Sequence, residues 1–189
     1  MQMTVYLKRL NQADAAVEYE FFQKMPEING FEVPYQNISF AEFLTNAIDE
    51  REDSSNGLNL PDGHVPDTYF FLWDNDKIVG LFKIRHYLND FLRQGPGHIG
   101  YGILPEFQGR GYGTAGLKLA LRKADKILPS NEPEIFLACA KTNLASLQVM
   151  KKNGGHVRHE NEHEYFVRVL RKAIDEPTSL VGRAAKFEY

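Results

Sequence analysis

The glycine-rich segment from Gly97 to Leu121, GHIGYGILPEFQGRGYGTAGLKLAL, constrains the fold of this chain most strongly. It begins with a strand-like apolar run, HIGYGIL, and six glycines fall within its first 17 residues. Apolar residues then recur at helical spacing from Leu117 to Leu128, and Pro129 ends the pattern. We therefore expect a strand, a loop of accessible backbone amides and a strong helix. A helix N-terminus of this kind binds anionic groups, and glycine lets a ligand approach the backbone closely.

The stretch from Gly111 to Gly116 spells GxGxxG, the fingerprint of dinucleotide-binding folds. In those folds the first glycine directly follows the strand, whereas Pro105–Arg110 intervene here, and too few strands follow to complete the sheet. The spacing therefore argues against NAD(H). A P-loop is excluded because no Gly-Lys pair is followed by Ser or Thr. The pattern favours a diphosphate held by backbone amides, to which Arg110 adds a charged contact.

Composition limits the classes of protein that this chain can join. Its 189 residues are 43% hydrophobic and 25% charged, which fits one globular domain, and a net charge of -3 argues against nucleic acid as a partner. No apolar run is long enough for a signal peptide or a membrane helix, so we expect a soluble cytoplasmic protein. The single Cys139 cannot form an internal disulfide, and its apolar neighbours predict a buried thiol.

Hydrophobic periodicity and turn residues predict an α/β fold with a mixed α+β sheet. Ser39 and Glu42 form a predicted capping box, and the polar turn DNDK joins two strands into an antiparallel hairpin. A single domain should cover residues 1–170, whereas 171–189 form either a flexible tail or an arm that packs on a second subunit of a homodimer. The expected elements are strands at 4–10, 68–73, 77–87, 98–104, 134–140 and 163–170, helices at 12–25, 39–53, 117–128 and 143–153, and long loops at 53–66 and 88–97.

Two motifs resemble a known family. The run from Gln108 to Gly113, QGRGYG, matches (Q/R)xxGx(G/A), the acetyl-CoA motif of the GNAT superfamily of N-acetyltransferases. The segment TNLASLQVMKKNGG resembles the second signature of that family, in which an Asn opens a helix beside the cofactor. The order of elements over residues 4–170 is also similar. The resemblance implies the GNAT fold, with a mostly antiparallel central sheet, helices on both faces and two splayed parallel strands.

The resemblance also implies acetyl-CoA as the cosubstrate. The amides from Gly109 to Thr114 would hold its pyrophosphate, and Asn143 would contact the pantetheine or phosphate arm. The backbone of Ile103 and Leu104 would pair with pantetheine, with the Leu104 N–H as donor to the thioester oxygen. Gly100 and Gly102 either make room for pantetheine or relieve packing against a large aromatic. The expected cofactor-binding residues are Ile103, Leu104, Gln108, Gly109, Arg110, Gly111, Tyr112, Gly113, Thr114 and Asn143.

The resemblance leaves the chemistry of proton transfer open. His98, on the central strand, is either the general base, because an unperturbed imidazole accepts a proton near neutral pH, or a hydrogen-bonded polar residue at the start of the strand. Arg85, His86 and Asn89 either line the acceptor site or form a polar strand end. Met150 stands where many relatives carry a Tyr that protonates the leaving thiolate. Either Tyr101 or Tyr112 then serves as the acid, or the thiolate leaves unassisted.

The sequence thus predicts an N-acetyltransferase that moves acetyl from acetyl-CoA to a primary amine of a small molecule or peptide, by direct transfer in a ternary complex. The alternative is a non-catalytic acyl-CoA-binding or sensing domain, since the usual acid is missing. No metal is expected, because His156, His159 and His163 lie in a strand-turn-strand region rather than on one helix face.

Overall fold

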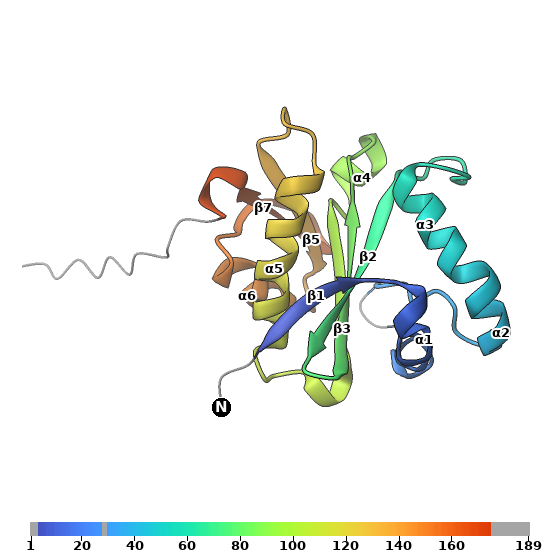
Figure 1. Cartoon of the computed structure of the whole chain (residues 1–189). Helices are drawn as coiled ribbons and strands as arrows, with labels where there is room; N and C mark the ends of the chain where they lie inside the picture. The colour runs from blue at the N-terminus through green and yellow to red at the C-terminus, as the bar shows by residue number, and fades with distance from the viewer. Residues whose placement is uncertain (1–3, 28–29, 175–189) are drawn as a thin grey trace, which may run out of the picture.

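The computed structural model describes residues 4–27 and 30–174 of the chain (Figure 1). Two sheets lie side by side, and every pairing within them is antiparallel. The first has the order β1-β2-β3-β4, with β1 (Val5–Arg9), β2 (Asp67–Asp74), β3 (Lys77–Arg85) and β4 (Ile99–Ile103). The second has the order β5-β7-β6, with β5 (Glu134–Ala140), β6 (His156–Glu160) and β7 (Glu164–Leu170). The two edge strands, β4 and β5, therefore face each other.

Some helices begin where a side chain satisfies one of their first amides. Ser39 and Glu42 form the expected capping box at the start of α2. A π-helical turn then joins α2 to α3, so the two form one long helix. The bounds are α1 (Ala15–Lys24), α2 (Phe40–Glu42), the π-turn (Phe43–Ala47), α3 (Ile48–Asn56), α4 (Asp90–Gln94), α5 (Tyr112–Ile127) and α6 (Leu144–Lys152).

Helices cover both faces of the first sheet, as expected, because β2 and β3 are buried on both sides. Phe70 and Leu72 of β2 join the core beneath α5, whereas Phe71 and Trp73 join a second core beneath α1 and α3. Figure 1 shows α5 on one side of these strands and α1 and α3 on the other. The segment after β4 thus continues on the opposite side of the sheet from the long α2–α3 helix.

The two sheets meet at one isolated bridge and then part. Gly97 bridges to Leu137, and the backbone N–H of His98 donates to the carbonyl of Phe136 at 2.7 Å. Gly97 has a φ of 70°, and a Cβ there would overlap the Phe136 carbonyl, so a residue with a side chain cannot make this contact. Beyond the bridge no ladder joins β4 to β5. The two strands separate here and form opposite walls of a cavity; the single bridge before the gap is antiparallel, and the described strands form no parallel ladder.

Three short features differ from the expected elements. The loop at 88–97 contains α4, which Asn89 caps by accepting the N–H of Leu92. The loop expected from residue 53 starts at Gly57, whose φ of 75° ends α3. A further strand, β6, pairs with β7 in the terminal hairpin. These elements are too short or too polar to show a hydrophobic period.

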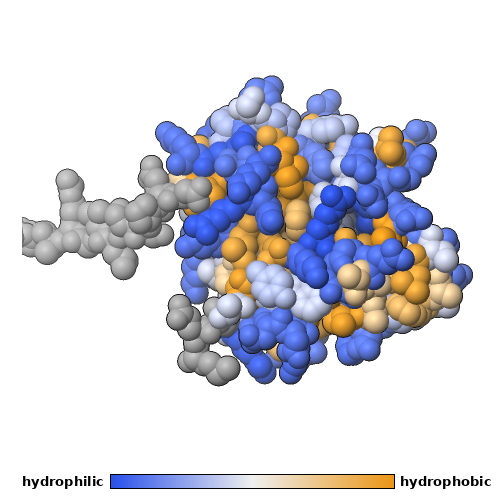
Figure 2. All heavy atoms as spheres, in the orientation of Figure 1, coloured by the Kyte–Doolittle hydropathy of each residue, from blue (hydrophilic) through white to orange (hydrophobic). Residues whose placement is uncertain are grey.

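The start of the expected tail is fixed to the domain. Arg171 donates to Asp125 Oδ1 at 2.7 Å and to the backbone carbonyls of Pro129 and Glu132 near the end of α5. The rest of the expected tail or subunit arm, residues 175–189, lies outside the described residues. Within the described ranges no helix is long and apolar enough to cross a membrane. Figure 2 shows polar side chains over most of one face, with apolar groups between them.

Candidate functional site

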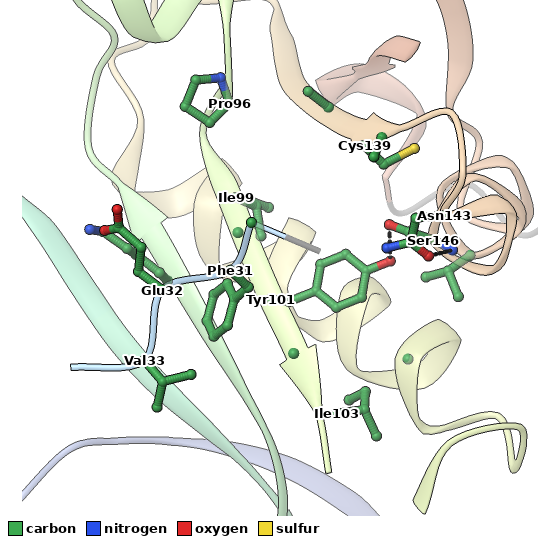
Figure 3. A pocket seen from close by; sticks show the side chains of 18 of the residues that line it. Phe31, Glu32, Val33, Pro96, Ile99, Tyr101, Ile103, Cys139, Asn143 and Ser146 are labelled. Carbon is green, nitrogen blue, oxygen red and sulfur yellow. Dashed lines mark hydrogen bonds between the residues drawn. The ribbon is translucent and has the colours of Figure 1, made fainter. Parts of the chain in front are cut away.

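A cavity of about 1280 Å³ opens where β4 and β5 part. One half is formed by the loop after β4, the first turn of α5, the end of β5 and α6. The other half is formed by residues 31–34, the loop before β2, and residues of β2, β3 and α4. The cavity therefore reaches both faces of β4 (Figure 3).

The glycine loop lies in the first half. Gly109 and Gly111 have φ values of 72° and 90°, in the left-handed region where glycine is favoured. The first intrahelical bond of α5 runs from Ala115 N–H to Gly111 O at 3.0 Å, so the amides of residues 112–114 have no partner within the helix. Together with the helix dipole they form an anion site. The expected residues that line the cavity here are Gln108, Gly109, Gly111, Gly113 and Thr114.

Two side chains of this loop turn away from the cavity. The Arg110 guanidinium lies 5.9 Å from the ring centre of Phe107, and the Tyr112 hydroxyl donates to Asp74 Oδ2 at 2.5 Å. Neither residue lines the cavity. Arg110 does not line the cavity, although Phe107 beneath its guanidinium does, so the charged contact from Arg110 stays a prediction.

The backbone of β4 exposes alternate amides to the gap. Leu104 N–H donates to Val79 O at 3.0 Å, and His98 O accepts from Arg85 N–H at 2.8 Å. Antiparallel pairing alternates, so Ile99, Tyr101 and Ile103 direct their backbone groups away from β3, toward the gap. The expectation that Leu104 N–H is the oxyanion donor is wrong, because the sheet already uses this N–H. Ile103 lines the cavity, and its carbonyl accepts from Gln108 Nε2 at 3.0 Å.

Asn143 and Tyr101 approach each other from opposite walls. Asn143 caps α6 by accepting the N–H of Ser146 at 3.1 Å, and it lines the cavity. The Tyr101 hydroxyl lies 2.9 Å from Ser146 Oγ (Figure 3). Burial raises the pKa of Tyr101 to about 12, although the hydrogen bond with Ser146 opposes the shift. Tyr101 is therefore a protonated phenol at neutral pH.

The helix α6 holds the two walls of the first half together. Met150 is buried in the core and does not line the cavity, so it takes no part in proton transfer. Asn153 Nδ2 donates to Thr114 O at 3.1 Å and to Val149 O at 2.9 Å, which ties the end of α6 to the start of α5. The sequence assigned no role to Asn153, because its position before the Gly154-Gly155 pair was the only signal that it gave. Cys139 also lines the cavity, and burial raises the pKa of its thiol.

His98 is not placed to act as the base. It is fully buried, does not line the cavity, and its Nδ1 accepts the backbone N–H of Phe136 at 2.9 Å. Burial, reinforced by the positive charges of Arg93 and Arg168, lowers the pKa of His98 to about 3. At neutral pH it is an uncharged acceptor that fastens β4 to β5. The expected role of His98 as general base is therefore wrong.

Of the three expected acceptor residues, only Arg85 lines the cavity. Its Nη1 donates to Gly97 O at 2.9 Å. His86 Nε2 lies 2.9 Å from Thr68 Oγ1, and Asn89 caps α4 and donates to Gly63 O at 2.9 Å. His86 and Asn89 are therefore structural here. Lys83 and Asp67, which sequence analysis did not select, line the cavity beside Arg85.

The glycines of β4 pack against side chains in the half of the cavity away from the glycine loop. A Cβ at Gly102 would overlap Met25 Cε and lie 3.1 Å from the Phe31 ring, and one at Gly100 would lie 3.4 Å from that ring. Figure 3 shows Phe31 and Tyr101 on opposite sides of the strand. Of the two interpretations given for these glycines, relief of packing against a large aromatic is the one that these contacts support.

A comparison of the sequence with models of protein families identifies the family of this chain. A model of the Acetyltransferase (GNAT) domain matches residues 4–156 of the chain. The chain belongs to this GNAT family. It is accordingly an acetyltransferase that uses acetyl-CoA to acetylate an amine. No curated protein matches the sequence.

Solved structures with the same fold share little sequence with this GNAT protein. The ribosomal-protein-S5-alanine acetyltransferase from Vibrio fischeri is 16% identical with a TM-score of 0.64, over 94% of this chain and 98% of that one. The spermidine N-acetyltransferase from Vibrio cholerae, solved with CoA and spermine, is 17% identical with a TM-score of 0.58, over 90% and 97%. A GNAT acetyltransferase from Streptococcus pneumoniae is 17% identical with a TM-score of 0.57, over 88% and 99%. They establish the fold.

The terminal hairpin carries histidines that do not converge. The His159 ring stacks on Phe166 with ring centres 4.3 Å apart. Across residues 4–27 and 30–174, no group of three or more His, Cys, Asp or Glu side chains is arranged to hold a metal ion.

Proposed function

We propose that this acetyltransferase transfers acetyl from acetyl-CoA directly to a primary amine of a small molecule or peptide, within a ternary complex. One observation carries the proposal: the free amides at the start of α5 open onto a cavity that continues past the edge of β4 to its other face. Both substrates then occupy one cavity at the same time. Cys139, the chain's one thiol, is buried, and burial raises its pKa, which argues against an acetyl-enzyme formed on sulfur.

The first half of the cavity suits coenzyme A. A diphosphate fits the amides of residues 109–114, where Gly109 has open space around the position of a Cβ. The gap-facing backbone groups of Tyr101 and Ile103 are suited to pair with the amides of an extended pantetheine arm. Acetyl-CoA supplies an acetyl group activated as a thioester. The Ile103 N–H, rather than that of Leu104, is the proposed donor to the thioester oxygen as negative charge develops there.

In the transfer step the acceptor nitrogen bonds to the acetyl carbon and the carbon–sulfur bond breaks. The amine must arrive without its extra proton, because a protonated amine has no lone pair. The nitrogen becomes positively charged as its bond to carbon forms, and it releases one proton to water. The thiolate that leaves takes a proton from the Tyr101 hydroxyl, which then recovers one from solvent. Tyr101 thus does from β4 what Met150 cannot do from α6.

Calorimetry and a CoA-release assay test this function. We expect acetyl-CoA to bind, and free thiol to appear faster with an amine acceptor than from background hydrolysis. Gly109→Glu should abolish cofactor binding, because it places a carboxylate among the amides that face the diphosphate. Gly154→Glu is the matched control, since Gly154 has a φ of 81°, equally open space and no place in the cavity.

Two outcomes would contradict the proposal. If a folded Gly109→Glu protein still binds acetyl-CoA, the loop is structural. If acetyl-CoA binds but a broad amine panel releases no CoA, the protein is the non-catalytic binding or sensing domain instead.

A further inference from the structure

Positive side chains gather in the half of the cavity away from the glycine loop. Lys83 and Arg85 lie two residues apart on β3, so their side chains lie on the same face of the strand, and both line the cavity. A third cation, Arg51 of α3, lies behind them against the ring of Tyr69, with its guanidinium carbon 4.9 Å from the ring centre. The Lys83 and Arg51 side chains are only 21% and 15% exposed, so these charges are largely removed from water.

The acidic groups nearby do not balance this cluster. Asp67 is the buried carboxylate, and it is shared: Oδ1 lies 3.2 Å from Arg51 Nη1 and Oδ2 lies 3.2 Å from Lys83 Nζ. The other acids on this side, Glu27 and Glu32 at the cavity rim and Glu50 beside Arg51, are solvent-exposed. Glu50 Oε1 lies 2.8 Å from Arg51 Nη2, so among the described residues the three cations have one buried and one exposed carboxylate within 4 Å of them.

Arg85 is the cation with the least compensation. Its hydrogen-bond partner is a neutral carbonyl, Gly97 O, and within the described residues no carboxylate lies within 4 Å of it. A guanidinium carries five N–H donors, so most of them remain for a ligand. Removing a cation from water without an anion beside it is costly, and Arg binds carboxylate and phosphate with paired N–H groups.

We propose that the acceptor carries, besides its amine, a carboxylate or phosphate group that binds between Lys83 and Arg85. This rests on the proposed function and names the class of amine: a zwitterionic or anionic acceptor rather than a polyamine. A polyamine would bring more positive charge to a site that already has an excess of it.

The position of the pair along β4 separates it from the diphosphate site. Lys83 lies opposite Gly100, and Arg85 lies beyond Ile99, near the bridge between the sheets. The glycine loop begins after the other end of the strand. Three residues of strand, roughly 10 Å, separate Gly100 from Ile103. The anion bound by Lys83 and Arg85 therefore belongs to the acceptor and not to the phosphates of coenzyme A.

Matched amines test the proposal. CoA release is measured with β-alanine, γ-aminobutyrate and 5-aminovalerate against their carboxamides, with phosphoethanolamine against ethanolamine, and with spermidine. We expect at least a 10-fold higher kcat/KM for the anionic member of the best pair. Comparison of the carboxylate amines with phosphoethanolamine shows which of the two anionic groups the site prefers.

Arg85→Gln and Lys83→Met should each lower kcat/KM for the preferred anionic amine by about 10-fold or more. They should change kcat/KM for its neutral partner and the Kd of acetyl-CoA by less than about 2-fold.

Controls remove charges elsewhere on the same sheets. Lys77→Met and Arg158→Gln change exposed residues outside the cavity and should leave all these values unchanged. A binding assay separates this proposal from catalysis: the N-acetylated forms of the same amines are titrated into CoA-loaded protein. The N-acetylated carboxylate or phosphate should bind at least 10-fold more tightly than its neutral partner, even if no turnover is seen.

The proposal fails if spermidine or the neutral amines are preferred, or if both members of every pair react and bind equally. It also fails if the two variants weaken acetyl-CoA instead of the acceptor, because the pair would then bind the phosphates of the cofactor. Absence of turnover together with anion-dependent binding of the acetylated amines would overturn only the proposed transfer.

Discussion

The residue types of His98 and Tyr101 suggest that the histidine takes part in proton transfer, but the structure favours the tyrosine. A histidine on the central strand is the natural candidate for acid–base chemistry, yet its ring is enclosed by apolar groups and cations, which lowers its pKa to about 3. Tyr101, three residues later, carries a hydroxyl that reaches the cavity between the sheets. Function at these positions depends on surroundings that come from β5 and α6, far away in the sequence.

Replacement of Tyr101 tests its role as acid. Tyr101→Phe should lower kcat roughly 10- to 100-fold at neutral pH, because the thiolate would leave without a proton donor. The Kd of acetyl-CoA should change by less than about 2-fold. Tyr19→Phe is the control, because it removes a hydroxyl that donates to Ile38 O at 2.8 Å outside the cavity. An unchanged kcat in Tyr101→Phe would mean that the thiolate leaves unassisted.

At the level of elements, the junction between β4 and β5 sets the shape of the site. Gly97 allows the backbones to touch, and the His98 side chain accepts a hydrogen bond from the same strand. Beyond this point the strands separate, so the cavity begins where the junction ends. Most strands of the two sheets were predictable from their hydrophobic runs. The position of the gap between β4 and β5 was not, because no local sequence pattern shows which strands lie next to each other.

A pair of variants tests the junction. His98→Leu should lower the free energy of unfolding by about 1–3 kcal/mol, because it leaves the buried N–H of Phe136 without an acceptor. His98→Asn should lose less, since its side-chain oxygen can replace Nδ1. Urea denaturation measures both. Neither variant should alter the shape of the pH–rate profile; loss of its acidic limb would restore His98 as the base.

For the molecule as a whole, Glu18 introduces a pH dependence of stability. Its carboxylate is fully buried in α1 and accepts the backbone N–H of Asn11 at 3.2 Å. Burial raises the pKa of Glu18 to about 8. Between pH 4.5 and 8 the native protein therefore holds a proton that the unfolded chain has released, so the free energy of unfolding falls as pH rises through this range.

Urea denaturation at pH 6.5 and pH 8 measures this effect. Wild-type protein should lose stability between the two values, and Glu18→Gln should lose less, because it has no proton to release. His98 titrates near pH 6.5 in the unfolded chain, but this contribution is the same in wild type and Glu18→Gln and cancels in their difference. Glu42→Gln is the control: hydrogen bonds from Ser39 lower the pKa of Glu42, so its titration is complete below this range. Parallel behaviour of wild type and Glu18→Gln would contradict the assignment.

Local patterns in the sequence were enough to predict the short-range features of this protein. The apolar period of α5, the glycines before it and the capping residues of α2 and α6 each depend on neighbours within a few positions, so the order of elements and the glycine loop could be predicted. Asn143, for example, caps α6 by accepting the N–H of Ser146, three residues away.

Which backbone and side-chain groups are free to bind or react depends on contacts between segments that are distant in the sequence. Whether the N–H of Leu104 or of Ile103 faces the gap depends on the register between β3 and β4. Whether Arg85 or His86 faces the cavity depends on the same alternation, since adjacent strand residues point to opposite faces. The excess of positive charge around Asp67 joins α3, β2 and β3, segments that are brought together only by burial of the two cores. Charge and hydrogen bonding across such distances are properties of the fold, and no window of the sequence contains them.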